Sequence, residues 1–260
     1  MRFDGKTIVV TGGALGIGRA ACEIFVSRGG SVSILDWDEA AGEALTSSIG
    51  ANGERCSFHK VDVADREAVE IAVAATVKEF GSIDALVVSA GIQRYGSALT
   101  TEDAEWEKVL GVNLKGAWNA ARACLPYLLK SRGPIVNVSS VQALASQQNV
   151  LAYTVSKHGL IGLTRSMAMD YAKAGVRVNA VCPGTVDTPM LKWAASLDPN
   201  PSSVYDACNA MHPLGRIAQP SEIAEVVAFL AHESSSFVTG SVWTADGGLL
   251  TQIGGVPQTS

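Results

Sequence analysis

The sequence predicts an α/β fold in which helices cover both faces of a doubly wound parallel sheet. Short apolar runs rich in β-branched residues alternate with longer segments of helical periodicity. The apolar runs are nearly continuous, which is typical of parallel strands that are buried on both faces. Regular alternation of strands and helices favours right-handed crossovers between neighbouring strands. A composition of 47% hydrophobic and 17% charged residues excludes a disordered chain.

The predicted elements follow one another in the order that a doubly wound sheet requires. The run at 55–61 is the weakest strand candidate, and the run at 241–244 would close the sheet. In chain order, the strand candidates are 6–10, 31–35, 55–61, 83–88, 134–138, 176–181 and 241–244, and the helical segments between them include 19–27, 67–80 and 102–129.

We expect one domain over residues 1–260. The length permits one large α/β domain or two small ones, but no linker divides the chain. Residues 183–213 are rich in Pro and Asn, and an insertion after the carboxyl end of a parallel strand falls over the ligand crevice. A lid over the substrate is therefore expected at about 186–213, with an irregular surface loop as the alternative. Residues 254–260 are expected to fray unless a partner subunit holds them.

Charge and cysteine usage argue against several classes of function. The net charge is −5, from 20 Lys and Arg against 25 Asp and Glu, which disfavours binding to nucleic acid or to anionic membranes. The five cysteines are scattered without a CxxC pair and the four histidines do not cluster, so no disulfide framework or metal site is expected. With no apolar signal region and no apolar run of ~18 residues, a soluble cytoplasmic protein is expected.

A glycine-rich loop follows the first predicted strand and opens a helix. In the segment 11–18, Gly12 permits a tight turn, Gly16 lets the backbone approach a diphosphate, and Gly18 allows close helix packing. Leu15 and Ile17 lie between these glycines and are counted with them as cofactor contacts. The spacing is GxxxGxG rather than GxGxxG, and a purely structural turn is the alternative. Because the loop joins a strand to a helix N-terminus, it predicts a dinucleotide site.

Asp36, at the end of the second predicted strand, favours NAD over NADP. A carboxylate there can accept hydrogen bonds from both ribose hydroxyls of an adenosine and repels a 2′-phosphate. The neighbouring positions hold Leu15 and Trp37, so no basic residue there would attract that phosphate. Asp62 could meet the adenine amino group, although an ordinary loop aspartate is an equal alternative.

The chemistry is predicted from Tyr153, Lys157, Ser140 and Asn113. Tyr153 and Lys157 are spaced i, i+4 on one helix face, where a cation depresses the pKa of a phenol toward that of a general base. Taken alone, this spacing is common, and a solvated pair is the alternative. Ser140 follows the strand at 134–138 and could hold the substrate oxygen. Asn113 is a polar residue inside an apolar helical pattern, so it is either hydrogen-bonded structure or the anchor of a water relay.

Taken together, these motifs resemble the short-chain dehydrogenase/reductase family. The set TGxxxGxG, Asp36, Asp62-Val63, Asn113, Ser140, YxxxK at 153–157 and Pro183-Gly184 covers almost the whole chain, from about Phe3 to the stretch 245–248. The resemblance implies a Rossmann-like domain with a seven-stranded parallel sheet and a homotetramer. Its interfaces would use the helices that carry Asn113 and Tyr153, together with residues 242–250.

The resemblance also implies roles for individual residues. Tyr153 would be the acid/base, Ser140 would orient the carbonyl or carbinol, Lys157 would bind the nicotinamide ribose, and Asn113 would hold a water that links Lys157 to solvent. Val186 would contact the nicotinamide carboxamide through its backbone. The implied cofactor contacts are Gly12, Leu15, Gly16, Ile17, Gly18, Asp36, Asp62, Val63, Ser89, Ala90, Gly91, Tyr153, Lys157, Pro183, Gly184, Val186 and Thr188.

One segment departs from the family pattern. The family usually has Asn-Asn-Ala-Gly after the fourth strand, whereas this chain has Val88-Ser89-Ala90-Gly91. Ser89 can still donate a hydrogen bond, but an asparagine brace to neighbouring strands is lost. The departure puts the local stability of the sheet in doubt rather than the chemistry.

The substrate is predicted from polar residues around the tetrad. Many amides suit a polyhydroxylated substrate, and Arg94 could pair with a carboxylate, with a surface arginine as the alternative. The expected substrate contacts are Arg94, Ser140, Gln142, Gln148, Tyr153 and Trp193. We expect an NAD-dependent dehydrogenase of a sugar or sugar acid. The alternatives are a 3-oxoacyl or other ketone reductase and a non-catalytic NAD(H)-sensing protein.

Overall fold

The computed structural model describes residues 1–50 and 55–252, which form a seven-stranded parallel sheet in the order β3-β2-β1-β4-β5-β6-β7. The chain crosses over after β3, so that β4 pairs with β1, and this reversal marks the crevice where doubly wound sheets bind ligands. The sheet and its crossovers confirm the predicted fold class. The strands are β1 (Thr7–Thr11), β2 (Ser31–Asp36), β3 (Cys56–Lys60), β4 (Ala85–Val88), β5 (Ile135–Val138), β6 (Val178–Pro183) and β7 (Val242–Ala245).

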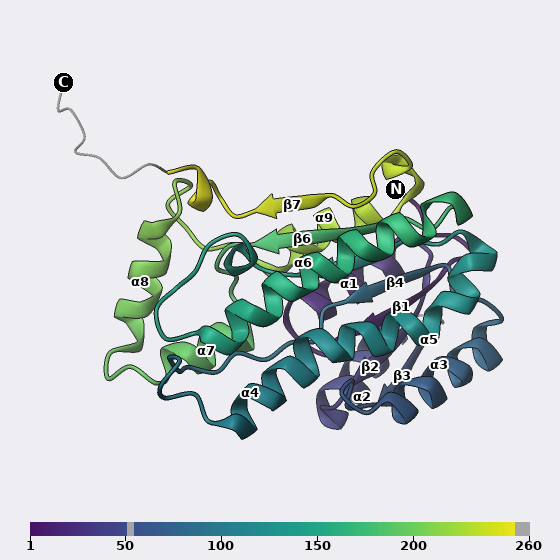
Figure 1. Ribbon diagram of the computed structural model, residues 1–260. Helices are drawn as coiled ribbons and strands as arrows, with labels where there is room; N and C mark the ends of the chain where they lie inside the picture. The colour runs from purple at the N-terminus through teal and green to yellow at the C-terminus, as the bar shows by residue number, and fades with distance from the viewer. Residues whose placement is uncertain (51–54, 253–260) are drawn as a thin grey trace.

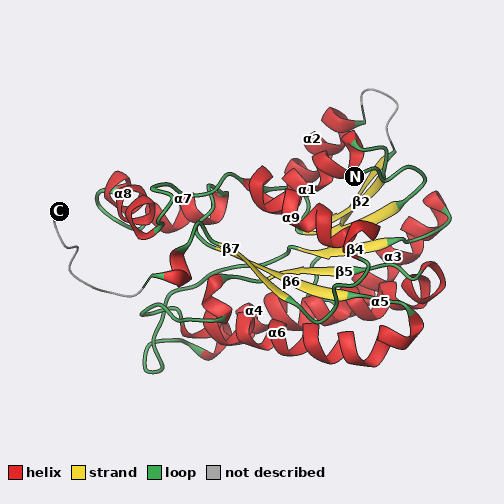
Figure 2. Ribbon diagram, turned by 90° about the horizontal axis from the view of Figure 1, so that it is seen from above, coloured by secondary structure: helices red, strands yellow, loops and turns green. Residues whose placement is uncertain are grey.

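Helices form a layer on each face of the sheet, as Figure 2 shows edge-on. One layer holds α1 (Gly16–Ser27), α2 (Glu39–Ile49) and α9 (Pro220–Ala231). The other holds α3 (Arg66–Phe80), α4 (Asp103–Leu110), α5 (Gly116–Ser131) and α6 (Leu151–Tyr171). Two further helices, α7 (Pro189–Ala195) and α8 (Pro201–Met211), lie beyond the carboxyl ends of the strands (Figure 1).

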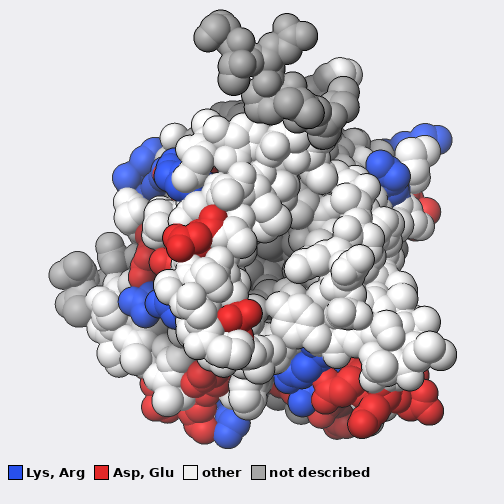
Figure 3. Space-filling model, turned by 90° about the vertical axis from the view of Figure 1, so that its left-hand side faces the viewer, with Lys and Arg blue, Asp and Glu red and all other residues white. Residues whose placement is uncertain are grey.

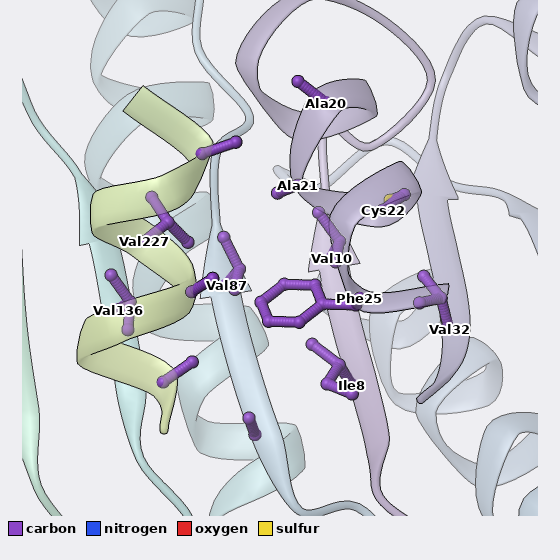
Figure 4. Packing of buried hydrophobic residues seen from close by; sticks show 14 of the residues in the cluster. Ile8, Val10, Ala20, Ala21, Cys22, Phe25, Val32, Val87, Val136 and Val227 are labelled. Carbon is purple, nitrogen blue, oxygen red and sulfur yellow. The ribbon is translucent and has the colours of Figure 1, made fainter. Parts of the chain in front are cut away.

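Successive residues of a strand contribute side chains to two separate hydrophobic cores. Ile8 and Val10 of β1 belong to the cluster under α1 and α9, whereas Val9 belongs to the cluster under α3, α5 and α6. In the first cluster, Phe25 of α1 and Val227 of α9 pack over the strands (Figure 4). Since side chains alternate between faces and both faces are covered, the central strands of this sheet are mostly apolar.

The long helical segment predicted at 102–129 is interrupted. α4 ends at Leu110, a π-helical turn spans Gly111–Lys115, and α5 begins at Gly116. A π turn adds a residue between two regular helices and often marks a functional position. Asn113 lies inside it, so a single regular helix through this residue was the wrong expectation.

The segment predicted as an irregular lid is largely helical. Thr188 caps α7 by accepting from the Leu191 N–H at 3.5 Å, and Pro189 stands at the first helical position. Pro201 opens α8 in the same way. Proline is tolerated at this position because its missing N–H has no partner there in any case. The residues 254–260 that were expected to fray lie outside the described part of the chain.

Within residues 1–50 and 55–252, no helix is both long enough and apolar enough to cross a membrane.

Candidate active site

The predicted cofactor and catalytic residues gather at the carboxyl ends of the strands. α7 and α8 lie at this end of the molecule (Figure 1), and the hollow at its centre is bordered mainly by uncharged residues, with acidic groups close beside it (Figure 3). The crevice between β1 and β4 opens here, which is where a doubly wound sheet binds its ligand.

The glycine loop has the geometry of a diphosphate cradle. Gly12 and Gly16 have φ of +63° and +56°, which side chains rarely adopt. A Cβ at Gly12 would lie 2.6 Å from the Cα of Ala90, and one at Gly18 would lie 2.0 Å from the carbonyl oxygen of Gly12. Among the described residues no side chain caps the N-terminus of α1, and its first turn holds no acidic residue. Its free N–H groups and dipole therefore suit an anion, so the loop fits a dinucleotide.

Asp36 lies at the edge of this cradle. Its Oδ2 accepts from the Ala14 N–H at 3.0 Å and its Oδ1 accepts from the Asp38 N–H at 3.1 Å, so the carboxylate is fixed to the loop. The residue is buried, while the neighbouring Trp37 is 75% exposed. A carboxylate held this way has acceptor sites left for a ribose.

Two further predicted cofactor contacts, Asp62 and Val63, follow β3. Asp62 is exposed, and its Oδ1 accepts from the Ala64 N–H at 2.9 Å, as in a loop turn. Val63 is buried in the core, and its carbonyl accepts from Asn119 Nδ2 at 2.9 Å. Nothing in these contacts distinguishes an adenine contact from an ordinary loop aspartate.

Backbone hydrogen bonds brace the segment that departs from the family pattern. The Ser89 N–H donates to the Thr11 carbonyl at 3.1 Å and the Ala90 N–H donates to Thr11 Oγ1 at 3.5 Å. The end of β4 is thereby tied to the end of β1 without an asparagine side chain.

Tyr153 and Lys157 form a buried pair on α6. The Lys157 ammonium lies 5.6 Å from the centroid of the Tyr153 ring and donates to the Val138 carbonyl at 2.9 Å. Burial raises the pKa of Tyr153 to about 12, so the expectation that Lys157 would lower this pKa was wrong for the cofactor-free protein; a hydrogen bond with Ser140 opposes the shift. Burial also lowers the pKa of Lys157 from 10.5 to about 8. At pH 7 the phenol is therefore protonated and the ammonium charged.

This arrangement suits proton transfer at an oxygen. A neutral phenol beside Ser140 can donate a proton to a ketone oxygen, and the nearby cation stabilises the phenolate that results. In the described structure the Lys157 ammonium has one hydrogen-bond acceptor, although it carries three donors. The remaining donors fit the hydroxyls of a bound ribose.

The buried side chain of Asn113 links two segments of the chain by hydrogen bonds. Its Oδ1 accepts from the Ile92 N–H at 2.8 Å, and its Nδ2 donates to the Ile92 carbonyl at 2.9 Å and to Ser156 Oγ at 3.0 Å. A Cβ at Gly91 would lie 3.5 Å from both Asn113 Oδ1 and Lys157 Nζ, so the two side chains converge there. Its side chain thus joins the loop after β4 to α6, and the water relay stays a prediction.

Comparisons with known proteins identify the family. A family model described as enoyl-(acyl carrier protein) reductase matches residues 12–250. The chain is 39% identical over 251 residues to the oxidoreductase UcpA of Salmonella typhimurium, covering 95% of each chain. It is 37% identical over 249 residues to the meso-2,3-butanediol dehydrogenase of Serratia marcescens, covering 95% and 96%. The aldohexose dehydrogenase of Thermoplasma acidophilum superposes with a TM-score of 0.90 at 39% identity, covering 98% of each chain.

The chain belongs to the short-chain dehydrogenase/reductase family. It is an oxidoreductase that acts on a secondary alcohol or ketone with a nicotinamide cofactor. The resemblance noted from the motifs is confirmed.

In this short-chain dehydrogenase, the predicted nicotinamide loop is held from two sides. The Thr185 N–H donates to His212 Nε2 at 3.1 Å, and the ring's Nδ1 lies 2.7 Å from the Cys208 carbonyl. A Cβ at Gly184 would lie 2.6 Å from His212 Nε2, so only glycine fits there. Val186 pairs with Ala218 in an isolated bridge. The loop that follows Pro183 is thus fixed in place.

The phosphate end and the nicotinamide end of the predicted cofactor site also meet. A Cβ at Gly16 would lie 3.2 Å from Thr188 Cγ2. Thr188, which caps α7, therefore places the start of this helix against the glycine loop.

The predicted substrate contacts differ in how they are engaged. Gln142 Oε1 accepts from Thr154 Oγ1 at 3.2 Å, and its Nε2 donates to Gln147 at 3.0 Å. Gln148 is exposed. The Arg94 guanidinium lies over Trp193, 5.3 Å from the ring centroid, and its Nε forms an ion pair with Glu105 at 3.0 Å. The arginine predicted as a free carboxylate ligand already has a carboxylate partner.

Three residues of this site were not singled out from the sequence. Ser156 Oγ donates to the Tyr153 carbonyl at 2.7 Å, Ser139 Oγ donates to the Lys157 carbonyl at 3.2 Å, and His212 braces the nicotinamide loop. Ser139 and Ser156 each precede a predicted catalytic residue, so a hydroxyl inside an apolar pattern was the available signal. Within the described ranges, no three His, Cys, Asp or Glu side chains form a group that could hold a metal ion.

Replacing Lys157 by Met tests the cost of burying its ammonium. At pH 7 Lys157 is charged in both the folded and the unfolded chain, and burial penalises the folded form. We expect Lys157→Met to raise the free energy of unfolding of the cofactor-free protein at pH 7 by about 2 kcal/mol, after allowing for the lost hydrogen bond. Urea unfolding measures this, with Lys173→Met, an exposed lysine, as the control expected to change little.

The difference in the free energy of unfolding between the wild type and Lys157→Met depends on pH. Above about pH 8 the folded lysine loses its proton, while the unfolded lysine keeps it up to about 10.5. Wild-type stability therefore gains from this group as the pH rises from 8 to 10, and the advantage of the Met variant shrinks. An advantage that grows over this range contradicts the burial of a charged Lys157.

Proposed function

We propose that this protein is an NAD-dependent dehydrogenase that interconverts a secondary alcohol and a ketone, with a sugar or sugar acid as substrate. The observation that carries the proposal is the buried Tyr153–Ser140–Lys157 arrangement, in a chain whose glycine loop leads into the uncapped N-terminus of α1. Support for a hydroxylated substrate comes from the names of two similar proteins, a meso-2,3-butanediol dehydrogenase and an aldohexose dehydrogenase.

Ser140, Tyr153 and Lys157 have separate roles in the proposed reaction. A bound nicotinamide supplies the hydride acceptor or donor. Ser140 holds the substrate oxygen, and Tyr153 gives its proton to that oxygen in reduction or takes the hydroxyl proton in oxidation. Lys157 stabilises the phenolate and binds the ribose. Met190 of α7 packs against the cluster that contains Tyr153 and so helps to exclude water from the buried phenol.

Asp36 supports NAD as the cofactor. Its fixed carboxylate would face the adenosine ribose, where a 2′-phosphate would be repelled.

The catalytic role of Tyr153 is tested by Tyr153→Phe. Turnover of secondary alcohols by the purified protein is expected to fall at least about 100-fold, because the proton carrier is lost. Binding of NADH, followed by fluorescence, should be retained. Tyr171→Phe, on the same helix, is the matched control and should keep its activity. Full activity in Tyr153→Phe contradicts the mechanism, and a wild type that binds NADH without turning over any alcohol favours the sensing alternative.

Cofactor choice is tested by Asp36→Asn. The wild type should use NAD in preference to NADP, and the variant should lose at least about tenfold of that preference, equivalent to about 1.4 kcal/mol. Initial rates with both cofactors measure it. Asp38→Asn removes a neighbouring charge and serves as the control. A wild type that prefers NADPH overturns the proposal and supports the ketone-reductase alternative.

We also propose that the protein is a cytoplasmic homotetramer. Leu110, Leu114, Trp118 and Leu163 line an apolar hollow across α4, the π turn, α5 and α6, which supports an interface on these helices. The cysteines are scattered along the sequence without a CxxC pair, which supports a reducing compartment. In light scattering, a mass other than about four times 27.0 kDa contradicts the tetramer, and cell fractionation tests the location.

A further inference from the structure

The rim of the substrate site is built from two segments that converge on Tyr153. Ile92, from the loop after β4, and Met190, from α7, both pack against the cluster that contains Tyr153. Arg94 lies two residues beyond Ile92, and Trp193 lies nearly one helical turn beyond Met190. Arg94 and Trp193 contact each other, and we take this pair as the rim of the proposed substrate site.

The loop that carries Arg94 is fixed at both ends. Asn113 holds the backbone of Ile92 through two hydrogen bonds. The Gly96 N–H donates to the Asn149 carbonyl at 2.7 Å, and the Leu151 N–H donates to the Gly96 carbonyl at 3.1 Å, where α6 begins. Arg94 is therefore held beside the helix that carries Tyr153 rather than on a free loop.

The charge of Arg94 is already compensated. Its Nε lies 3.0 Å from Glu105 Oε2, and its Nη1 donates to the Gln93 carbonyl at 2.8 Å. Glu105 Oε2 is removed from solvent and has no hydrogen bond within the described part of the chain, so the ion pair is its compensation. A carboxylate on the substrate would have to compete with Glu105 for the same guanidinium.

The remaining rim surface is aromatic. Tyr95 and Trp193 stack with their ring centroids 5.8 Å apart and their planes 18° apart, and the guanidinium lies over the indole. Aromatic faces and a neutralised arginine favour an uncharged substrate, and the nearby carboxylate disfavours an anionic one.

We propose that Glu105 is a specificity-determining residue that acts through Arg94: by pairing with this arginine at the rim, it restricts the enzyme to uncharged hydroxylated substrates and excludes carboxylated ones. The inference rests on the proposed function and narrows its substrate class from sugars and sugar acids to neutral compounds. Glu105 is a positioning residue, since it reaches the substrate through the arginine it holds and neutralises.

The test uses two probes that share a CH₃–CHOH group and differ in charge, 1,3-butanediol and 3-hydroxybutyrate. Their binding to the NADH-loaded protein is measured by calorimetry, and kcat/KM is measured with NAD. The wild type should prefer the diol at least tenfold. Glu105→Gln should shift the ratio at least tenfold toward 3-hydroxybutyrate, because Arg94 becomes free to bind it.

Three further variants separate charge selection from structural effects. Arg94→Gln leaves the Glu105 carboxylate unpaired, so binding of 3-hydroxybutyrate should weaken further while binding of the diol stays nearly constant. In the double variant Arg94→Gln/Glu105→Gln, the shift toward 3-hydroxybutyrate that Glu105→Gln alone produces should disappear. Glu102→Gln makes the same charge change at the N-cap of α4, where its side chain makes no capping hydrogen bond, and should leave the ratio unchanged.

Failure of this proposal can be distinguished from failure of the proposed function. Failure of dehydrogenase activity appears as no turnover of either probe, and the calorimetric ratio still decides the role of Glu105. A wild type that binds 3-hydroxybutyrate as well as the diol, a protein that binds neither, or a Glu105→Gln variant that changes both affinities equally overturns the proposal.

Discussion

The site depends on the burial of one positive charge. Lys157 is 3% exposed, and its ammonium lies between the Val138 carbonyl and the ring of Tyr153. A buried ammonium with one acceptor is costly, which is why burial lowers its pKa to about 8. Under the proposed function, this charge stabilises the phenolate of Tyr153, and a bound ribose satisfies the remaining donors.

Much of the surrounding structure holds that charge in place. Ser139 holds the Lys157 carbonyl, Asn113 and Ser156 join the loop after β4 to α6, and the capped α7 brings Met190 against Tyr153. The two segments that contribute Ile92 and Met190 to the packing around Tyr153 also carry Arg94 and Trp193. Under the two proposals, proton transfer and substrate selection would therefore depend on the same packed segments.

The sequence could predict those features that are encoded locally. The glycine loop, Asp36 and the Tyr153–Lys157 spacing each depend on neighbours along one strand or helix, so their types and positions were sufficient. The ion pair between Arg94 and Glu105 was not predictable, because it joins a loop to a separate helix and neither residue has a periodic signal. The helices within residues 183–213 were not predicted, since Pro189 and Pro201 begin helices rather than interrupt them. His212 was set aside as a ligand and is instead a brace between α8 and the loop after β6.

The pKa of Lys157 in the cofactor-free protein is the most direct test of this account. Lysine labelled with ¹³C at Cε allows its titration to be followed by NMR, and the Lys157→Met variant assigns the signal. The account predicts a midpoint near pH 8 for this lysine, with exposed lysines near 10.5. A midpoint of 10.5 for Lys157 would show that its ammonium is solvated, and the buried charge could not then be the feature around which the site is built.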